Sequence, residues 1–159
     1  MDLTFTRGDV EAASGVLTAT AAHLAALGRS LWPVSSLTPQ RLERQYPAPT
    51  WRVAWLGTRP VGTFSLLPED PLFWPEAAPG EALYLHKLGV HPDAQGQGLA
   101  SLLLEEAVRE TREAGVPLLR LDTAATRPKL RALYEAAGFG AVDERHVRGF
   151  HVVRYELGV

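Results

Sequence analysis

The sequence runs Val90-His91-Pro92-Asp93-Ala94-Gln95-Gly96-Gln97-Gly98-Leu99-Ala100 near its middle, and this stretch decides the fold. The residues before it, Ala82–Val90, alternate as a strand does, and those after it recur at helical spacing. The loop therefore opens a helix, whose first turn leaves backbone N–H groups unpaired and carries about half a positive charge. Gly96 and Gly98 allow a ligand to approach the backbone closely. The stretch predicts an anion site, with a phosphate as the natural ligand.

Two general nucleotide motifs compete for these glycines. A P-loop requires a Lys directly after its last glycine, and Leu99 follows Gly98, so that motif is excluded. The dinucleotide fingerprint G-x-G-x-x-G is met except at its last position, Ser101, and Asp122 follows at a plausible distance. Against it, five residues separate the glycines from the strand, and one β-α-β unit cannot supply a doubly wound sheet. A Rossmann-type protein stays open as an alternative.

A third interpretation rests on two motifs. Gln95-Gly96-Gln97-Gly98-Leu99-Ala100 resembles the Q/R-x-x-G-x-G/A signature of the GCN5-related N-acetyltransferase (GNAT) family, and Leu133-Tyr134-Glu135-Ala136-Ala137-Gly138-Phe139 matches its L-Y-x-x-x-G-F pattern. Leu88-Gly89-Val90 is similar to the strand end that precedes the family's loop. The resemblance covers about residues 82 to 140. It implies an acetyl-CoA-dependent acetyltransferase whose loop binds the CoA pyrophosphate.

The resemblance also implies which residues bind the cofactor: Leu88, Gly89, Val90, Gln95, Gly96, Gln97, Gly98, Leu99, Ala100 and Arg127. Gly89 inside a strand fits a bulge beside the pantetheine arm, or equally a glycine packed beneath a helix. Arg127 departs from the family, in which many members have Asn there. Arg127 then either meets a phosphate or stays in solvent.

The chemistry of acetyl transfer asks for an acid and a base. The attacking amine must be neutral, although a Lys-type amine has a pKa of roughly 10. The departing thiolate gains from an O–H donor, and the resemblance assigns that general acid to Tyr134. Tyr134 also falls on the buried stripe of its helix, where a Tyr can simply fill space. His86 is a candidate base, because imidazole titrates near neutral pH, although a His here can equally be packed in the sheet with one nitrogen hydrogen-bonded. Glu81 and an ordered water chain are the alternatives.

The remaining sequence predicts short elements in the order β-α-α-β-β-β-α-β-α-β-β. Strands are expected over Leu3–Thr6, Trp51–Leu56, Val61–Leu67, Ala82–Val90, Leu118–Thr123, Val142–Arg148 and Phe150–Leu157. Asp9 and Thr38 are expected to cap the first two helices, and Gly57–Pro60 to form a hairpin turn. This order predicts a mixed α/β fold: one domain over 1–159, with a mostly antiparallel sheet of about seven strands and helices on both faces.

Composition limits the function classes. The net charge of −2 provides no basic field for nucleic acid, and no apolar run is long enough for a membrane span. We expect a cytoplasmic protein, because the first residues lack a signal-peptide pattern. The absence of Cys excludes a cysteinyl intermediate, and the five His residues lack metal-ligand spacing, so no metal is expected.

The acceptor is the least constrained part. Trp32, Phe73 and Trp74 lie in regions from which the family draws its acceptor pockets, although each can equally be core or a dimer contact. We expect a primary amine of a small molecule, attacked directly in a ternary complex, and a homodimer stays open. The alternative function is a module that binds acyl-CoA or a metabolite without chemistry.

Overall fold

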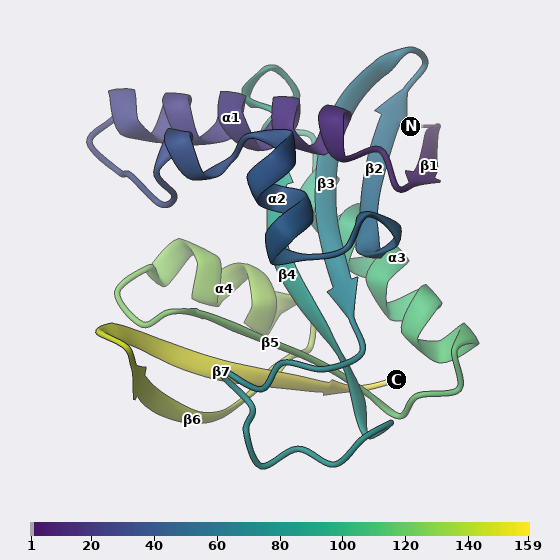
Figure 1. The fold of residues 1–159 in the computed structure, drawn as a ribbon, viewed down its shortest axis with the longest axis vertical. Helices are drawn as coiled ribbons and strands as arrows, with labels where there is room; N and C mark the ends of the chain where they lie inside the picture. The colour runs from purple at the N-terminus through teal and green to yellow at the C-terminus, as the bar shows by residue number, and fades with distance from the viewer. Residues whose placement is uncertain (1) are drawn as a thin grey trace. The chain divides into compact units, whose positions relative to one another are not determined.

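The computed structural model describes residues 2–159, which form seven strands and four α-helices (Figure 1). The strands are β1 (Leu3–Arg7), β2 (Trp51–Leu56), β3 (Arg59–Leu67), β4 (Ala82–Val90), β5 (Leu118–Ala124), β6 (Gly140–Val147) and β7 (Phe150–Gly158). The α-helices are α1 (Val10–Ala26), α2 (Pro39–Gln45), α3 (Leu99–Glu113) and α4 (Pro128–Ala136). Short 3-10 helices are η1 (Val34–Ser36), η2 (Ala48–Thr50) and η3 (Pro92–Ala94).

The strands form one mixed sheet in the order β1-β2-β3-β4-β5-β7-β6. β4 pairs with β5 in parallel, whereas β1 with β2, β2 with β3, β5 with β7 and β6 with β7 are antiparallel. The predicted element order and the mostly antiparallel seven-stranded sheet are therefore confirmed.

The chain divides into two compact units. The first comprises the chain up to Leu66 together with His86–Leu103, and the second comprises Leu67–Leu85 and Leu104–Val159. β4 gives its last residues to the first unit and its first residues to the second. The expectation of a single domain over 1–159 stays a prediction.

The core of the first unit is the apolar stripe of α1 packed against α2 and β2. Both helices begin at the predicted caps, because a side-chain oxygen of Asp9 accepts from the Ala12 N–H at 2.9 Å and that of Thr38 accepts from the Arg41 N–H at 3.3 Å. Removing this apolar surface from water stabilises the unit. The buried residues are Val10, Ala13, Leu17, Ala21, Leu37, Leu42, Trp51 and Val53.

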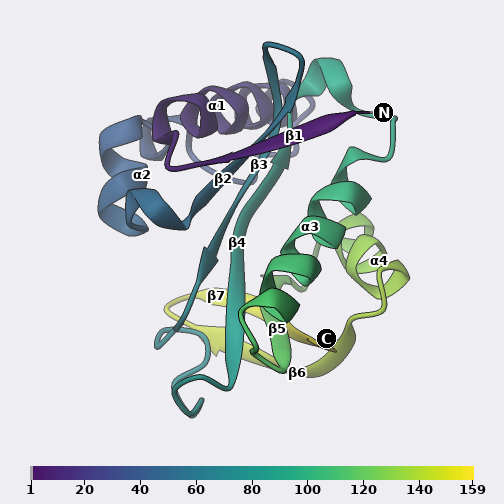
Figure 2. The same ribbon diagram turned by 90° about the vertical axis from the view of Figure 1, so that its right-hand side faces the viewer.

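Two glycines mark opposite faces of the strands in the first unit. A Cβ added to Gly62 would lie 2.9 Å from Leu103 Cδ1 of α3, and one added to Gly89 would lie 2.9 Å from Leu17 Cδ2 of α1. Figure 2 shows α1 and the first turn of α3, which both belong to this unit, on opposite sides of β3. The two helices can pack this closely onto the strands because neither glycine carries a side chain.

Two turn predictions were wrong in detail. β3 begins at Arg59, so Pro60 lies inside the strand, opposite Trp55, where the register shifts and a missing N–H is tolerated. In the second hairpin, Arg148 belongs to the turn and not to β6. Arg148 (φ 47°) and Gly149 (φ 84°) supply the two positive φ angles of a type I′ turn.

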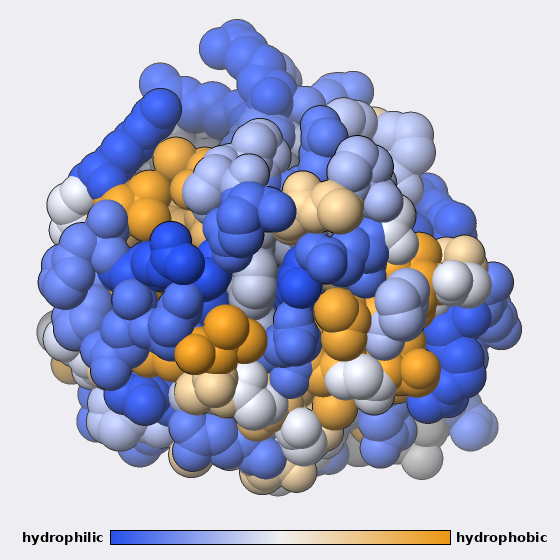
Figure 3. Space-filling model, turned by 90° about the horizontal axis from the view of Figure 1, so that it is seen from below, coloured by the Kyte–Doolittle hydropathy of each residue, from blue (hydrophilic) through white to orange (hydrophobic). Residues whose placement is uncertain are grey.

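Apolar side chains reach the surface in separate places. Figure 3 shows one face of the molecule, where hydrophobic patches are divided by hydrophilic groups. Among residues 2–159 no helix is both long and apolar enough to cross a membrane. The large exposed apolar residues are Leu27, Val34, Leu72, Val142 and Phe150.

Candidate active site

The predicted anion loop joins β4 to α3 through η3. Gly96 (φ 80°) and Gly98 (φ 75°) both adopt the left-handed conformation, which side chains disfavour. The Leu102 N–H donates to Gly98 O at 3.3 Å and so begins the helical ladder of α3. The N–H groups of Leu99, Ala100 and Ser101 therefore have no carbonyl partner within the helix. This is the arrangement that stabilises an anion.

Hydrogen bonds hold the start of this loop against its own unit. The His91 N–H donates to Val61 O at 2.8 Å, which fixes the end of β4 beside β3. The carbonyl oxygen of Val90 accepts from Thr20 Oγ1 at 2.9 Å and from Gln95 Nε2 at 3.4 Å. Gln95 to Gly98 are exposed. The loop is thus anchored at one end while its glycine segment faces solvent.

β4 is irregular just before this anchor. Lys87 has φ 55°, an uncommon angle for a residue with a side chain. The His86 ring stacks on Tyr46 with centroids 4.9 Å apart, and Lys87 Nζ lies 5.2 Å from the Trp32 ring centroid. Two consecutive side chains therefore contact the segment that precedes β2. The positive φ of Lys87 thus interrupts regular strand geometry between His86 and Leu88.

Close packing of α1 against β4 leaves no room for a side chain at Gly89. The position that its Cβ would occupy is within contact of Leu17 Cδ2, at 2.9 Å, and of the Trp32 ring, at 3.9 Å. Of the two interpretations of this glycine, the structure supports the packed one directly. The irregular backbone angle of β4 lies two residues earlier, at Lys87.

Tyr134 lies in the second unit, on α4, and is 7% exposed. Its ring packs against Phe139 and Tyr155, with centroid distances of 6.0 and 6.1 Å. Burial, followed by the charge of Asp122, raises the pKa of the Tyr134 phenol well above its usual value. The hydroxyl therefore keeps its proton at neutral pH, as a proton donor must.

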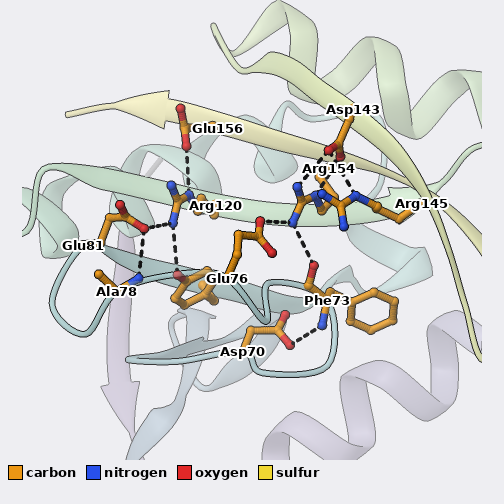
Figure 4. A network of polar contacts seen from close by, with 11 residues as sticks. Asp70, Phe73, Glu76, Ala78, Glu81, Arg120, Asp143, Arg145, Arg154 and Glu156 are labelled. Carbon is orange, nitrogen blue, oxygen red and sulfur yellow. Dashed lines mark hydrogen bonds and ion pairs between the residues drawn. The ribbon is translucent and has the colours of Figure 1, made fainter.

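Glu81 is held in an ion pair. Arg120 Nη1 donates to Glu81 Oε2 at 2.8 Å, and the Ala78 N–H donates to the same carboxylate at 3.3 Å (Figure 4). These hydrogen bonds, with that from Arg120 the stronger, lower the pKa of Glu81. A carboxylate with a lowered pKa is a weaker base. Glu81 also precedes β4, whereas the glycine loop follows it.

Two buried arginines organise the second unit, and the sequence analysis missed both. Arg154 Nε and Nη2 donate to the two oxygens of Asp143 at 2.7 and 2.8 Å, while Nη1 donates to Phe73 O at 3.1 Å and to Glu76 (Figure 4). Arg120 pairs with Glu156 as well as Glu81. The sequence could have indicated both arginines, because each interrupts an otherwise apolar strand. A charged residue at such a position is expected to be buried and to need partners of opposite charge.

Trp74 lies between these arginines. The guanidinium carbons of Arg120 and Arg154 are 4.6 and 4.2 Å from the Trp74 ring centroid, and the side chain is 3% exposed. Cation–π contacts on a buried ring hold the β3–β4 connection in place. Phe73, whose N–H donates to Asp70 Oδ1 at 3.2 Å, is half-buried. Trp74 is therefore enclosed, while Phe73 remains partly accessible.

The predicted site residues divide between the two units. The first unit brings together His86, Trp32 and the whole loop segment from Leu88 to Ala100. The second contains Tyr134, Glu81, Phe73, Trp74 and Arg127. Arg127 precedes α4 as its capping residue, but its side chain makes no capping hydrogen bond.

The fold and the loop are those of a known family. The model of the acetyltransferase (GNAT) family matches residues 20–139, which is most of the chain. The chain belongs to the GNAT acetyltransferase family.

One curated protein and several solved structures are similar to this chain. The chain is 40% identical over 81 residues to a mycothiol acetyltransferase of Beutenbergia cavernae, over 51% of this chain and 26% of that enzyme, so it matches about a quarter of that relative's length. A GNAT family acetyltransferase from Listeria monocytogenes has the same fold, with a TM-score of 0.77, 20% identity and coverage of 98% and 95% of the two chains. A GNAT acetyltransferase from Elizabethkingia anophelis with acetyl-CoA bound aligns with a TM-score of 0.62 at 18% identity, over 76% and 83%.

The arginine network predicts a specific acid sensitivity. Hydrogen bonds from Arg154 hold the pKa of Asp143 below its usual value. A depressed carboxyl pKa adds stability above the unfolded-state value, and that stability is lost as the pH falls through the folded-state value. The free energy of unfolding should therefore decline below about pH 4. In Arg154→Met it should be lower by about 2 kcal/mol at pH 7 and decline less in acid.

Chemical denaturation between pH 3 and 7 measures both effects. The matched control is Arg109→Met, which removes an arginine paired with Glu106 and Glu113 on the exposed side of α3. It should change stability little, because surface ion pairs contribute little. Equal losses in the two variants, or an Arg154→Met curve parallel to wild type, would contradict this account.

Proposed function

We propose that this chain is an acetyl-CoA-dependent N-acetyltransferase that transfers the acetyl group to a primary amine by direct attack in a ternary complex. The observation that carries the proposal is the exposed glycine loop at the start of α3, in a chain of the GNAT family. Its unpaired N–H groups and left-handed glycines suit the pyrophosphate of a CoA thioester. The bound acetyl-CoA of the Elizabethkingia relative supports this choice of donor.

The donor would lie along β4 and the loop. Gln95 to Ala100 would hold the pyrophosphate, and the backbone of Leu88, Gly89 and Val90 would lie beside the pantetheine arm. Acetyl-CoA supplies the activated thioester. The N–H of Val90 or Leu88 would stabilise the oxyanion that forms when the amine attacks. The clamped carbonyl of Val90 supports a preorganised strand end here.

Tyr134 is proposed as the general acid that protonates the leaving thiolate. The raised pKa of the Tyr134 phenol keeps the hydroxyl protonated at neutral pH, so that it can donate a hydrogen bond to the sulfur as the thiolate leaves. Arg127, close to Tyr134 along the chain, is proposed to contact the cofactor.

His86 is proposed as the base that accepts the proton of the attacking amine. Its imidazole lies in β4, four residues before the strand ends, and stacks on Tyr46. Glu81 is the weaker alternative, because Arg120 already occupies its carboxylate. An ordered water chain is the remaining alternative.

The acceptor is proposed to be a small molecule, which the match to an enzyme named for mycothiol favours. Trp32 and Phe73, both half-buried, are the proposed acceptor contacts, and Trp74 would act only by holding Phe73. A cytoplasmic location and a homodimer stay predictions.

Tyr134→Phe tests the acid directly, because it keeps the ring and removes only the hydroxyl. With an amine that the enzyme acetylates, kcat should fall by about 100-fold, while the Kd for acetyl-CoA stays unchanged. The matched control is Tyr84→Phe, a second buried tyrosine whose hydroxyl accepts from Arg120 at 3.2 Å. Unchanged turnover in Tyr134→Phe would remove Tyr134 from the chemistry.

His86→Ala tests the base. The rate near neutral pH should fall, and the pH–rate profile should keep only the dependence that comes from deprotonation of the amine itself, because the proposed base is gone. Glu81→Gln is the companion variant, which should keep the wild-type profile. If the two variants exchange these outcomes, Glu81 is the base; if neither changes the profile, both assignments fail.

A further inference from the structure

Tyr155 is a buried polar side chain of the second unit that the proposed chemistry does not use. It lies on β7 between its neighbours Leu121 of β5 and Ala141 of β6, and it is 0% exposed. Its hydroxyl donates to Glu135 Oε2 at 2.6 Å and accepts from Arg131 Nε at 3.2 Å. The one hydroxyl thus joins β7 to α4 by two hydrogen bonds.

Those two partners flank Tyr134. Arg131 and Glu135 are four residues apart, so they share one face of α4, and Tyr134 directly precedes Glu135. The rings of Tyr134 and Tyr155 also contact each other, with centroids 6.1 Å apart and planes inclined by 42°. Tyr155 therefore contacts Tyr134 through its ring and holds α4, the helix that carries Tyr134, through its hydroxyl.

The Tyr134 hydroxyl itself has no hydrogen-bond partner among residues 2–159. Its direction is therefore set by ring packing and by the placement of α4, and not by a bond at the oxygen. Phe139 contacts the Tyr134 ring edge-on, at 6.0 Å and 73°. Tyr155 is the second aromatic side chain that contacts the Tyr134 ring.

We propose that Tyr155 is a positioning residue, which sets the direction of the Tyr134 hydroxyl by holding α4 through Arg131 and Glu135. This inference rests on the proposed role of Tyr134 as the acid. A displacement of a reacting group by a fraction of an ångström slows transfer without weakening cofactor binding. Loss of the Tyr155 hydroxyl should therefore lower kcat and leave the KM for acetyl-CoA unchanged.

Tyr155→Phe is a mild change for the fold. The ring that fills the core is kept, and the two groups left without the hydroxyl can turn to water, because Glu135 is exposed and Arg131 is only half-buried. Replacing a hydrogen-bonded group by an apolar one of the same shape costs little when its partners are solvated.

A double-mutant cycle separates positioning from structure. In the wild-type background, Tyr155→Phe should lower kcat by about tenfold. In the Tyr134→Phe background, the same change should lower kcat by less than about twofold, because the group that it positions is already absent. Tyr84→Phe, the matched buried tyrosine, should leave kcat unchanged in both backgrounds.

A second variant guards against loss of folding. Glu135→Leu removes the hydrogen bond from the exposed surface of α4 and should reproduce the effect of Tyr155→Phe, while Glu135→Gln, which can still accept, should restore wild-type kcat. If Tyr134→Phe lowers kcat but Tyr155→Phe causes the same fold loss in both backgrounds, the positioning role of Tyr155 is contradicted while the acid role of Tyr134 stands. A Tyr134→Phe variant with normal kcat would overturn both the acid assignment and the inference built on it.

Discussion

The unpaired N–H groups at the start of α3 are the constraint on which the proposed site depends. A helix cannot satisfy its first-turn donors internally, and the residue that precedes α3, Gly98, has no side chain to cap them. Gly96 and Gly98 keep the backbone open there by adopting angles that side chains disfavour. Bonds from His91 and Gln95 fix the adjoining end of β4. An anion would complete this arrangement, and we propose that it is the pyrophosphate of acetyl-CoA.

In the second unit, the main constraint is the burial of two charged arginine side chains. Arg120 and Arg154 are buried, and each is neutralised by carboxylates that remain partly in solvent. Removing a buried charge's partner is costly, so the network holds the β3–β4 connection firmly through Trp74 and Phe73. Tyr155 does the same for α4 with a single hydroxyl. The arginine network thus positions Phe73, and the Tyr155 hydroxyl positions Tyr134; both positioned residues have proposed roles in the reaction.

Local patterns predicted the fold well, because hydrophobic period, caps and turn residues act over a few positions: Asp9, Thr38 and the element order all behave as expected. The loop motif could also be predicted, because Gly96 and Gly98 are needed there for backbone angles that side chains disfavour. What failed depends on tertiary contacts. Trp74 is enclosed by Arg120 and Arg154, which are distant in sequence, and no local pattern signals the positive φ of Lys87. The ion pair of Glu81 with Arg120 joins residues 39 apart, which no local pattern signals.

Calorimetric titration of acetyl-CoA tests the central claim most directly, using wild type, Gly98→Val and Gly149→Val. Both glycines have positive φ, 75° and 84°, so valine strains the backbone in each, but Gly149 lies in the β6–β7 turn. The account predicts that wild type and Gly149→Val bind alike, whereas Gly98→Val binds at least about tenfold more weakly, which is about 1.4 kcal/mol. Equal affinity in all three proteins, or no binding to wild type, would contradict it.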